Sequence, residues 1–296
     1  MLKHCIAAIR PRTLPVAVAP VIVGTCLAWA DNYSLCLPVM LAAMFAAMAI
    51  QIGTNLHNDV TDFERGGDDP ATRLGPPRAT AEGWLTPDAV RRGARISFAA
   101  AAACGIYLVI VGGWPILLAG LFSLAAGFAY SGGPRPISYT PLGELFVWLF
   151  FGVVAVTGSY YLQSMQISGR AVIAGALLGL PAAAVLAVNN YRDLEDDRRV
   201  GRKTFAVLFG RAASRAEYTV LMLLPFLMMP LVATSFSVWW WLPFVALPWA
   251  IILVRRFFSF VPGEEFNLLL ANTAKFQLAL SGLLGVAIIG GAGSVG

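Results

Sequence analysis

The sequence predicts an all-α integral membrane protein, in which about nine transmembrane helices form a single domain over residues 1–296. Hydrophobic residues make up 58% of the chain and charged residues only 12%, about half the charged fraction of a soluble domain. These values exclude an ordinary soluble globular protein. They also exclude a disordered chain, because disorder requires low hydrophobicity. The four cysteines show no C-x-x-C spacing, so we expect neither a zinc site nor a disulfide framework.

Nine segments reach or approach the roughly 17–25 mainly apolar residues that a transmembrane helix requires. In chain order they are Leu14–Ala30, Pro38–Thr54, Ala94–Val111, Pro115–Tyr130, Leu142–Gln163, Ala171–Asn189, Tyr218–Phe236, Val238–Val254 and Leu268–Ile289. The ninth carries Lys275 in its interior. Two interpretations of Lys275 stay open: its stem extends to the lipid headgroups, or it faces the bundle and meets a polar partner.

The charged residues lie almost entirely on one side of these nine helices. The side that holds the N-terminus receives 19 of the 21 Lys and Arg residues, which leaves Arg170 opposite and Lys275 within the ninth helix. The positive-inside rule makes this side cytoplasmic. We therefore expect a multi-pass protein of the cell inner (cytoplasmic) membrane with its C-terminus outside. All but one of the 16 acidic residues share the cytoplasmic side, which indicates chemistry there, since membrane insertion does not select for acids.

The second and sixth predicted helices end in matching polar clusters. The first cluster comprises Asn55, Asn58, Asp59 and Asp62. The second comprises Asn189, Asp193 and Asp197. Residues three and four apart share one face of a helix, so each cluster forms a stripe. Both follow an even-numbered helix and so face the cytoplasm.

A divalent cation would relieve the repulsion within each cluster and the cost of placing carboxylates near a bilayer. Carboxylate and amide oxygens are ligands that Mg²⁺ takes, and it commonly shares substrate phosphates. A single cluster of this kind is equally well explained as a solvated helix end. Two matching clusters on the same membrane face favour a metal site.

Basic residues close to the clusters indicate a polyphosphate ligand. The nearest are Arg73, Arg78, Arg192 and Lys203. A metal bridges phosphate oxygens while arginine binds the remainder. The other arginines are explained by topology alone. No G-x-x-x-x-G-K-[ST] sequence occurs, so this is not a P-loop site.

Residues 130–139 are rich in Gly and Pro, which indicates a third cytoplasmic segment without helix. Tyr130 and Tyr139 either line a pocket or lie in the aromatic belt. We expect Glu144, which follows shortly after, at the membrane interface.

The loops after the second and sixth helices are expected to contain short helices that form a cytoplasmic cap over the site. Thr86 and Pro87 provide a favourable helix start, with Thr as N-cap and Pro at the first helical position. Gly175 and Gly179 give the sixth helix a face that a neighbouring helix can approach closely.

Four stretches of the chain carry motifs that occur together in one family. They are Arg10-Pro11-Arg12-Thr13-Leu14-Pro15; Asn55-x-x-Asn58-Asp59-x-x-Asp62 with Gly67 and Asp68; Tyr130-Ser131-Gly132-Gly133-Pro134-x-Pro136 with Leu142-Gly143-Glu144; and Asn189-Asn190-x-Arg192-Asp193-x-x-x-Asp197 with Gly201-Arg202-Lys203-Thr204. This combination resembles the UbiA superfamily of membrane prenyltransferases, and within it those acting on 1,4-dihydroxy-2-naphthoate. The departures are small: Asp196 and Ser131 replace threonines, and G-R-K-T replaces G-K-R-T.

The resemblance implies a nine-helix bundle and a Mg²⁺-dependent aromatic prenyltransferase. A polyprenyl group would pass from an allylic prenyl diphosphate to 1,4-dihydroxy-2-naphthoate with loss of CO₂, giving demethylmenaquinol of menaquinone biosynthesis. Two Mg²⁺ ions would neutralise the diphosphate. The first cluster would hold the ions on one side and the second cluster on the other. The implied catalytic residues are Asp59, Asp62, Asp193, Asp197, Tyr130 and Tyr139. The prenyl tail would lie between helices and open to membrane lipid, and no nucleic-acid partner is expected.

Two alternatives remain. Related enzymes share much of this pattern, so the acceptor could be another aromatic such as 4-hydroxybenzoate. A membrane transporter also carries intramembrane acids, but it places its site near the bilayer midplane, usually with broken helices. Here both acidic clusters lie at helix ends on one face, which favours the enzyme.

Overall fold

The computed structural model describes residues 2–67, 70, 73–233, 237–263 and 265–292. Within these ranges the chain is helical, with no strands. The α-helices are α1 (Leu2–Ile9), α2 (Leu14–Ala30), α3 (Leu37–Glu64), α4 (Pro87–Gly112), α5 (Trp114–Ala129), α6 (Gly143–Trp148), α7 (Ala155–Ser164), α8 (Gly169–Arg192), α9 (Leu194–Arg199), α10 (Phe205–Val232), α11 (Leu247–Ser259) and α12 (Glu265–Ala292). Asp68, part of the predicted first motif, lies outside the described residues.

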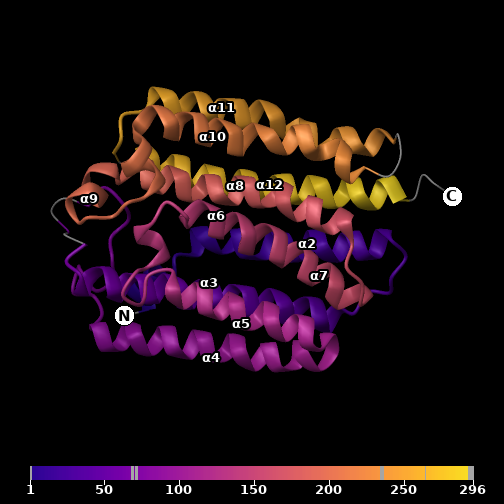
Figure 1. Ribbon diagram of the computed structural model, residues 1–296, viewed down its shortest axis with the longest axis horizontal. Coiled ribbons are helices and arrows are strands. Elements are labelled where there is room, and N and C mark those ends of the chain that lie inside the picture. Colours follow the sequence, from indigo (N-terminus) through magenta and orange to yellow (C-terminus); the bar gives the residue numbers. More distant parts are fainter. Residues whose placement is uncertain (1, 68–69, 71–72, 234–236, 264, 293–296) are drawn as a thin grey trace.

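The long helices lie side by side in one bundle (Figure 1). Eight helical segments of the described residues are long and apolar enough to cross a membrane, and the shorter apolar α5 accounts for the fourth predicted span. The prediction of an all-α membrane bundle is therefore confirmed. The short helix α9 lies at one end of the bundle, and the C-terminal end of α12 lies at the other (Figure 1).

Helix boundaries differ from the prediction where polar residues continue a helix beyond its apolar run. The third predicted span begins at Ala94, whereas α4 begins at Pro87, because the Thr86 hydroxyl oxygen accepts a hydrogen bond from the backbone N–H of Ala89 at 3.3 Å. Thr86 and Pro87 thus start the long helix itself. The second motif loop contains the expected short helix, α9, whereas the described residues of the first loop form turns.

Two predicted spans are not uniform α-helices. The fifth consists of α6, a π-helical segment (Leu149–Val154) and α7. The eighth begins as a 3₁₀ helix (Val238–Ala246) and continues into α11. Hydropathy measures only whether a segment is apolar, so it does not distinguish these helix types.

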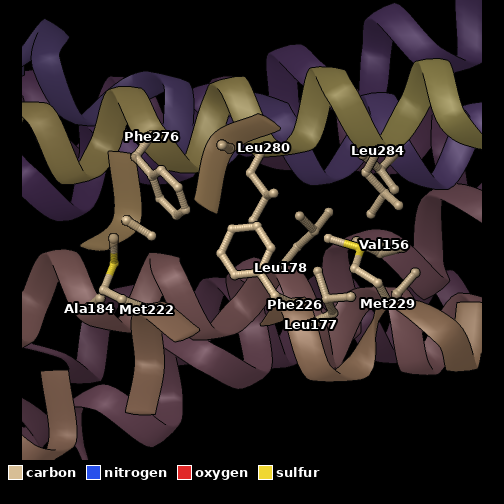
Figure 2. Packing of buried hydrophobic residues seen from close by; sticks show 14 of the residues in the cluster. Val156, Leu177, Leu178, Ala184, Met222, Phe226, Met229, Phe276, Leu280 and Leu284 are labelled. Atoms are coloured by element: carbon tan, nitrogen blue, oxygen red, sulfur yellow. The ribbon is translucent and has the colours of Figure 1, made fainter. Parts of the chain in front are cut away.

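The main hydrophobic core lies between α8, α10 and α12, with contributions from α2, α7 and α11. Figure 2 shows Met222, Phe226 and Met229 of α10 packed with Leu177 and Leu178 of α8, beside the α12 residues Phe276, Leu280 and Leu284. This packed half contrasts with the half built from α3, α4 and α5, where the core clusters are smaller.

Three glycines allow the π-helical segment to approach α8 closely. A Cβ atom on Gly152 would overlap the backbone of Gly175 and Gly179. This confirms the prediction that a neighbour approaches α8 at these two residues. Because α6 directly precedes the π-helical segment, the close approach also fixes the position of α6.

Replacing Gly152 with alanine is expected to lower the stability of the detergent-solubilised protein by about 1–3 kcal/mol, the usual cost of overpacking. Gly282→Ala is the matched control, because a Cβ there meets no atom within 4 Å. Thermal melts of both variants check this, and equal melting temperatures would show that the two helices do not pack this closely.

Candidate active site

The two predicted clusters meet at one end of a cavity of about 1010 Å³. Its other walls are apolar and belong mainly to α3, α4, α5 and the α6–α7 segment. The predicted site residues that line the cavity are Asn55, Asn58, Asp62, Arg73, Arg78, Tyr130, Asn189, Arg192, Asp193 and Asp197. The cavity therefore has one polar, charged end, and the rest of it is apolar.

In the first cluster, Asp62 is almost completely buried, with 1% of its surface exposed. One carboxylate oxygen accepts a hydrogen bond from Arg78 Nη2 at 3.0 Å, and the other accepts one from Arg202 Nη2 at 2.6 Å. The amide oxygen of Asn58 is buried and has no hydrogen-bond partner among the described residues. The cluster thus combines a doubly paired carboxylate with an unsatisfied oxygen.

Asp59, which the sequence predicts as a metal ligand, contacts the loop that follows α3. Its carboxylate accepts hydrogen bonds from the backbone N–H groups of Ala79 (2.9 Å) and Thr80 (3.1 Å), and from the Thr80 hydroxyl. It is not among the residues that line the cavity. We therefore assign Asp59 to anchoring the loop that follows α3, although it shares a helix face with Asp62.

Asn55 also has a local role. Its amide nitrogen donates to the carbonyl oxygen of Ile9 at 3.0 Å and lies 3.2 Å from the hydroxyl oxygen of Thr13. These contacts tie the N-terminal segment to α3. Asn55, Asn58 and Asp62 are the first-cluster residues that line the cavity.

The second cluster is organised around the buried Arg192. Its guanidinium donates to both carboxylate oxygens of Asp193, at 2.7 and 2.6 Å, and to the amide oxygens of Asn189 (2.8 Å) and Asn267 (2.7 Å). Asn267 in turn donates to the carbonyl oxygen of Leu74 at 2.9 Å, which holds the first motif loop against α12. Sequence reasoning missed Asn267, because a lone amide near a helix start carries no signal.

Arg202 joins the two clusters. Besides Asp62, its guanidinium donates to Asp197 at 3.3 Å, and it lies 4.8 Å from the centre of the Tyr139 ring. The sequence pointed to Lys203 instead, but this side chain is exposed and outside the cavity lining. The inverted order of G-R-K-T was the available signal that an arginine takes the inner position.

Burial raises the pKa of the Asp197 carboxyl to about 7. Arg202 opposes this shift, whereas the nearby carboxylates of Asp193 and Asp62 add to it. The negative charge at this end of the cavity is therefore incompletely compensated, and additional positive charge would stabilise the ionised form.

The two tyrosines of the Gly- and Pro-rich segment at residues 130–139 have different positions. Tyr130 lines the cavity. Tyr139 is not a lining residue, and its ring instead lies against Arg202 and Arg65. Glu144, expected at the interface, is buried.

Lys275 lies on the exposed face of α12 and is not among the cavity residues. This position supports the first interpretation, in which the stem extends along the lipid to the headgroups. Replacing Lys275 with methionine is therefore expected to leave the KM for an aromatic acceptor unchanged within about twofold. A large rise in that KM, at an unchanged KM for prenyl diphosphate, would place Lys275 in the acceptor site.

Comparisons with known proteins show which family and fold the chain resembles. The sequence profile of the UbiA prenyltransferase family matches residues 17–292. The 1,4-dihydroxy-2-naphthoate octaprenyltransferase of Bacillus subtilis is 32% identical, with 95% of this chain and 90% of that protein aligned. The enzyme of the same name from Mycobacterium tuberculosis is 37% identical over 71% of this chain and 70% of its own.

Solved structures share the fold. The structure of a UbiA homolog from Archaeoglobus fulgidus bound to GPP and Mg²⁺ superimposes with a TM-score of 0.69 at 18% identity, covering 97% of this chain and 99% of that one. A second structure of that homolog, bound to DMAPP and Mg²⁺, gives a TM-score of 0.68 at 17% identity, with the same coverage.

Proposed function

Since the chain belongs to the UbiA prenyltransferase family, we propose that it transfers a polyprenyl group from an allylic prenyl diphosphate to 1,4-dihydroxy-2-naphthoate. The ring carboxylate leaves as CO₂, and the product is demethylmenaquinol of menaquinone biosynthesis. One observation carries the proposal: Asp62 and Asp197, from two motifs far apart in sequence, are bridged by Arg202 at the polar end of an apolar cavity. This arrangement suits a substrate with a diphosphate head and an isoprenoid tail.

The donor set is suited to Mg²⁺. Among the described residues, no three Asp, Glu, His or Cys side chains stand close enough to hold a metal ion as they are oriented, because the carboxylates are turned toward arginines. The buried, unpartnered oxygen of Asn58 and the strongly raised pKa of Asp197 both favour an added cation. Two ions would be held by Asn58 and Asp62 on one side and by Asn189, Asp193 and Asp197 on the other, so that Mg²⁺ offsets the charge of the leaving diphosphate.

The protein's own residues then bind and orient the substrates. Arg73, Arg78, Arg192 and Arg202 lie at the same end of the cavity and supply donors for diphosphate oxygens. The apolar walls hold the prenyl tail and exclude water from the allylic cation that forms when the C–O bond breaks. Tyr130 lines the cavity at its polar end, where its neutral hydroxyl can contact the acceptor ring.

An assay of the purified protein tests the proposal. With Mg²⁺ and a long-chain prenyl diphosphate, 1,4-dihydroxy-2-naphthoate labelled in its carboxyl group should release labelled CO₂ in step with a prenylated product. Prenylation of 4-hydroxybenzoate alone, without CO₂ release, would instead assign the protein another acceptor within the same family.

We further propose that the site faces the cytoplasm of the cell inner membrane, because 19 of 21 basic residues lie on that side of the predicted topology. In a cysteine-free background, Gly67→Cys should resist a membrane-impermeant thiol reagent added to intact cells. Ser34→Cys, in the exposed loop after α2, should react readily. The reverse pattern would invert the orientation.

A further inference from the structure

The carboxylate of Glu144 is buried in the wall behind the cavity, and none of the steps above uses it. Glu144 lies in the first turn of α6 and has 7% of its surface exposed. One carboxylate oxygen accepts a hydrogen bond from the amide nitrogen of Asn190 on α8 at 2.7 Å. The other oxygen is buried and has no partner among the described residues. A carboxylate that receives only one hydrogen bond is costly to bury. This cost indicates that Glu144 has a role beyond joining two helices.

The hydrogen bond determines how Asn190 presents its amide. The amide nitrogen of Asn190 faces Glu144, because it donates to one of the Glu144 oxygens. The amide oxygen is then directed elsewhere, and Asn190 is one of the residues that line the cavity. Its neighbour Asn189 contacts Arg192 in the second cluster. Asn190 therefore lies beside the polar end, with an oxygen left for a hydrogen-bond donor.

The same wall offers two hydroxyl groups. Tyr130 and Ser138 line the cavity, and the backbone N–H of Ser138 donates to the Tyr130 carbonyl oxygen at 2.9 Å. The Ser138 hydroxyl is buried without a partner among the described residues. The Tyr130 hydroxyl lies close to Gly143, the residue before Glu144. A Cβ atom added to Gly143 would be about 4.0 Å from this hydroxyl. These groups are suited to a small polar aromatic molecule.

We propose that Glu144 is a positioning residue that holds the Asn190 amide oxygen toward the cavity, where this oxygen accepts a hydrogen bond from a ring hydroxyl of the aromatic acceptor. The inference rests on the proposed function and deepens it by assigning the acceptor's hydroxyl to the Glu144–Asn190 pair. An amide oxygen whose N–H₂ group donates to a carboxylate is a stronger acceptor, since linked hydrogen bonds polarise one another. A hydroxyl that donates to it enriches the ring in electrons, which favours attack on the allylic cation.

Equilibrium binding of stable acceptor analogues tests this without turnover. The probes are 1-hydroxy-2-naphthoate, 4-hydroxy-2-naphthoate and 2-naphthoate, whose fluorescence is followed on binding to the purified protein. The wild-type protein should bind at least one hydroxynaphthoate about tenfold or more tightly than 2-naphthoate, because a site that hydrogen-bonds a hydroxyl discriminates against its absence. Glu144→Leu should abolish this preference. In separate steady-state assays of prenyl transfer, the same variant should raise the acceptor KM about tenfold, with the KM for prenyl diphosphate within about twofold of wild type.

The conservative variant separates positioning from packing. Glu144→Gln retains a carbonyl oxygen that can accept from Asn190, so it should keep most of the hydroxyl preference. Asn190→Ala should lose the preference, which provides an independent test if Glu144→Leu does not fold. Retention of the full hydroxyl preference in folded Glu144→Leu or Asn190→Ala would overturn the inference while leaving the proposed function intact. Failure of the wild-type protein to bind any hydroxynaphthoate would overturn the naphthoate acceptor and the inference with it.

Discussion

Replacing Asp193 with asparagine is expected to lower kcat by two or more orders of magnitude while the protein remains folded. Asp193 lies at the polar end of the cavity and retains 19% exposure, so its replacement creates no buried void. The variant removes one negative oxygen from the set that would hold Mg²⁺. A single electrostatic group of this kind typically contributes 10²–10³ to a rate.

Glu195→Gln is the matched control for this variant. Glu195 is two residues further along the chain but points outward, with 66% of its side chain exposed and ion pairs only to Arg198 and Arg211 among the described residues. Its loss should change kcat by less than about twofold. Steady-state kinetics at saturating Mg²⁺ measure both variants. Wild-type turnover by a folded Asp193→Asn would remove the second cluster from the catalytic site.

Replacing Asp59 with alanine is expected to destabilise the protein rather than to remove a metal ligand. The variant leaves the backbone N–H groups of Ala79 and Thr80 and the Thr80 hydroxyl without their acceptor, in a region where Asp59 itself is 1% exposed. Orphaning buried donors costs about 1–3 kcal/mol for each group, so the total is expected to be on the order of 3 kcal/mol or more.

Melting temperature and Mg²⁺ affinity distinguish the two roles of Asp59. Loop anchoring predicts a large fall in melting temperature and an unchanged Mg²⁺ affinity in the fraction that stays folded. A wild-type melting temperature combined with lost Mg²⁺ binding would instead assign Asp59 to the metal, as its place in the motif had indicated.

The comparison of Asp59 with Asp62 shows what the sequence could and could not predict. Helical spacing placed both on one stripe, and the polar clusters at the ends of α3 and α8 are where hydropathy and periodicity put them. Which carboxylate faces the cavity depends on the loop at residues 79–80, and no local pattern encodes that contact. The helices were predictable because long apolar runs in a membrane have few alternatives.

The same limit applies to the cationic residues. The side chain that enters the site is Arg202, while Lys203 turns outward, after a chain reversal in which Gly201 adopts a left-handed φ of 76°. Asn267 reaches Arg192 only through packing of α12 against α8, across 75 positions of the chain. Such partners are set by tertiary structure, so they cannot be assigned from spacing within a motif.

In the proposed site, both clusters hold one metal–diphosphate complex together. Calorimetric titration with geranyl S-thiolodiphosphate, an analogue that resists ionisation, measures this directly. With Mg²⁺ present, we expect saturable binding to the wild-type protein, at least about tenfold weaker in Asp193→Asn, since loss of a charge-assisted contact costs about 1.5–3 kcal/mol. With excess EDTA, binding should fall to the level of that variant or below. Equal affinity of the wild-type protein in Mg²⁺ and in EDTA would contradict a shared metal–diphosphate site.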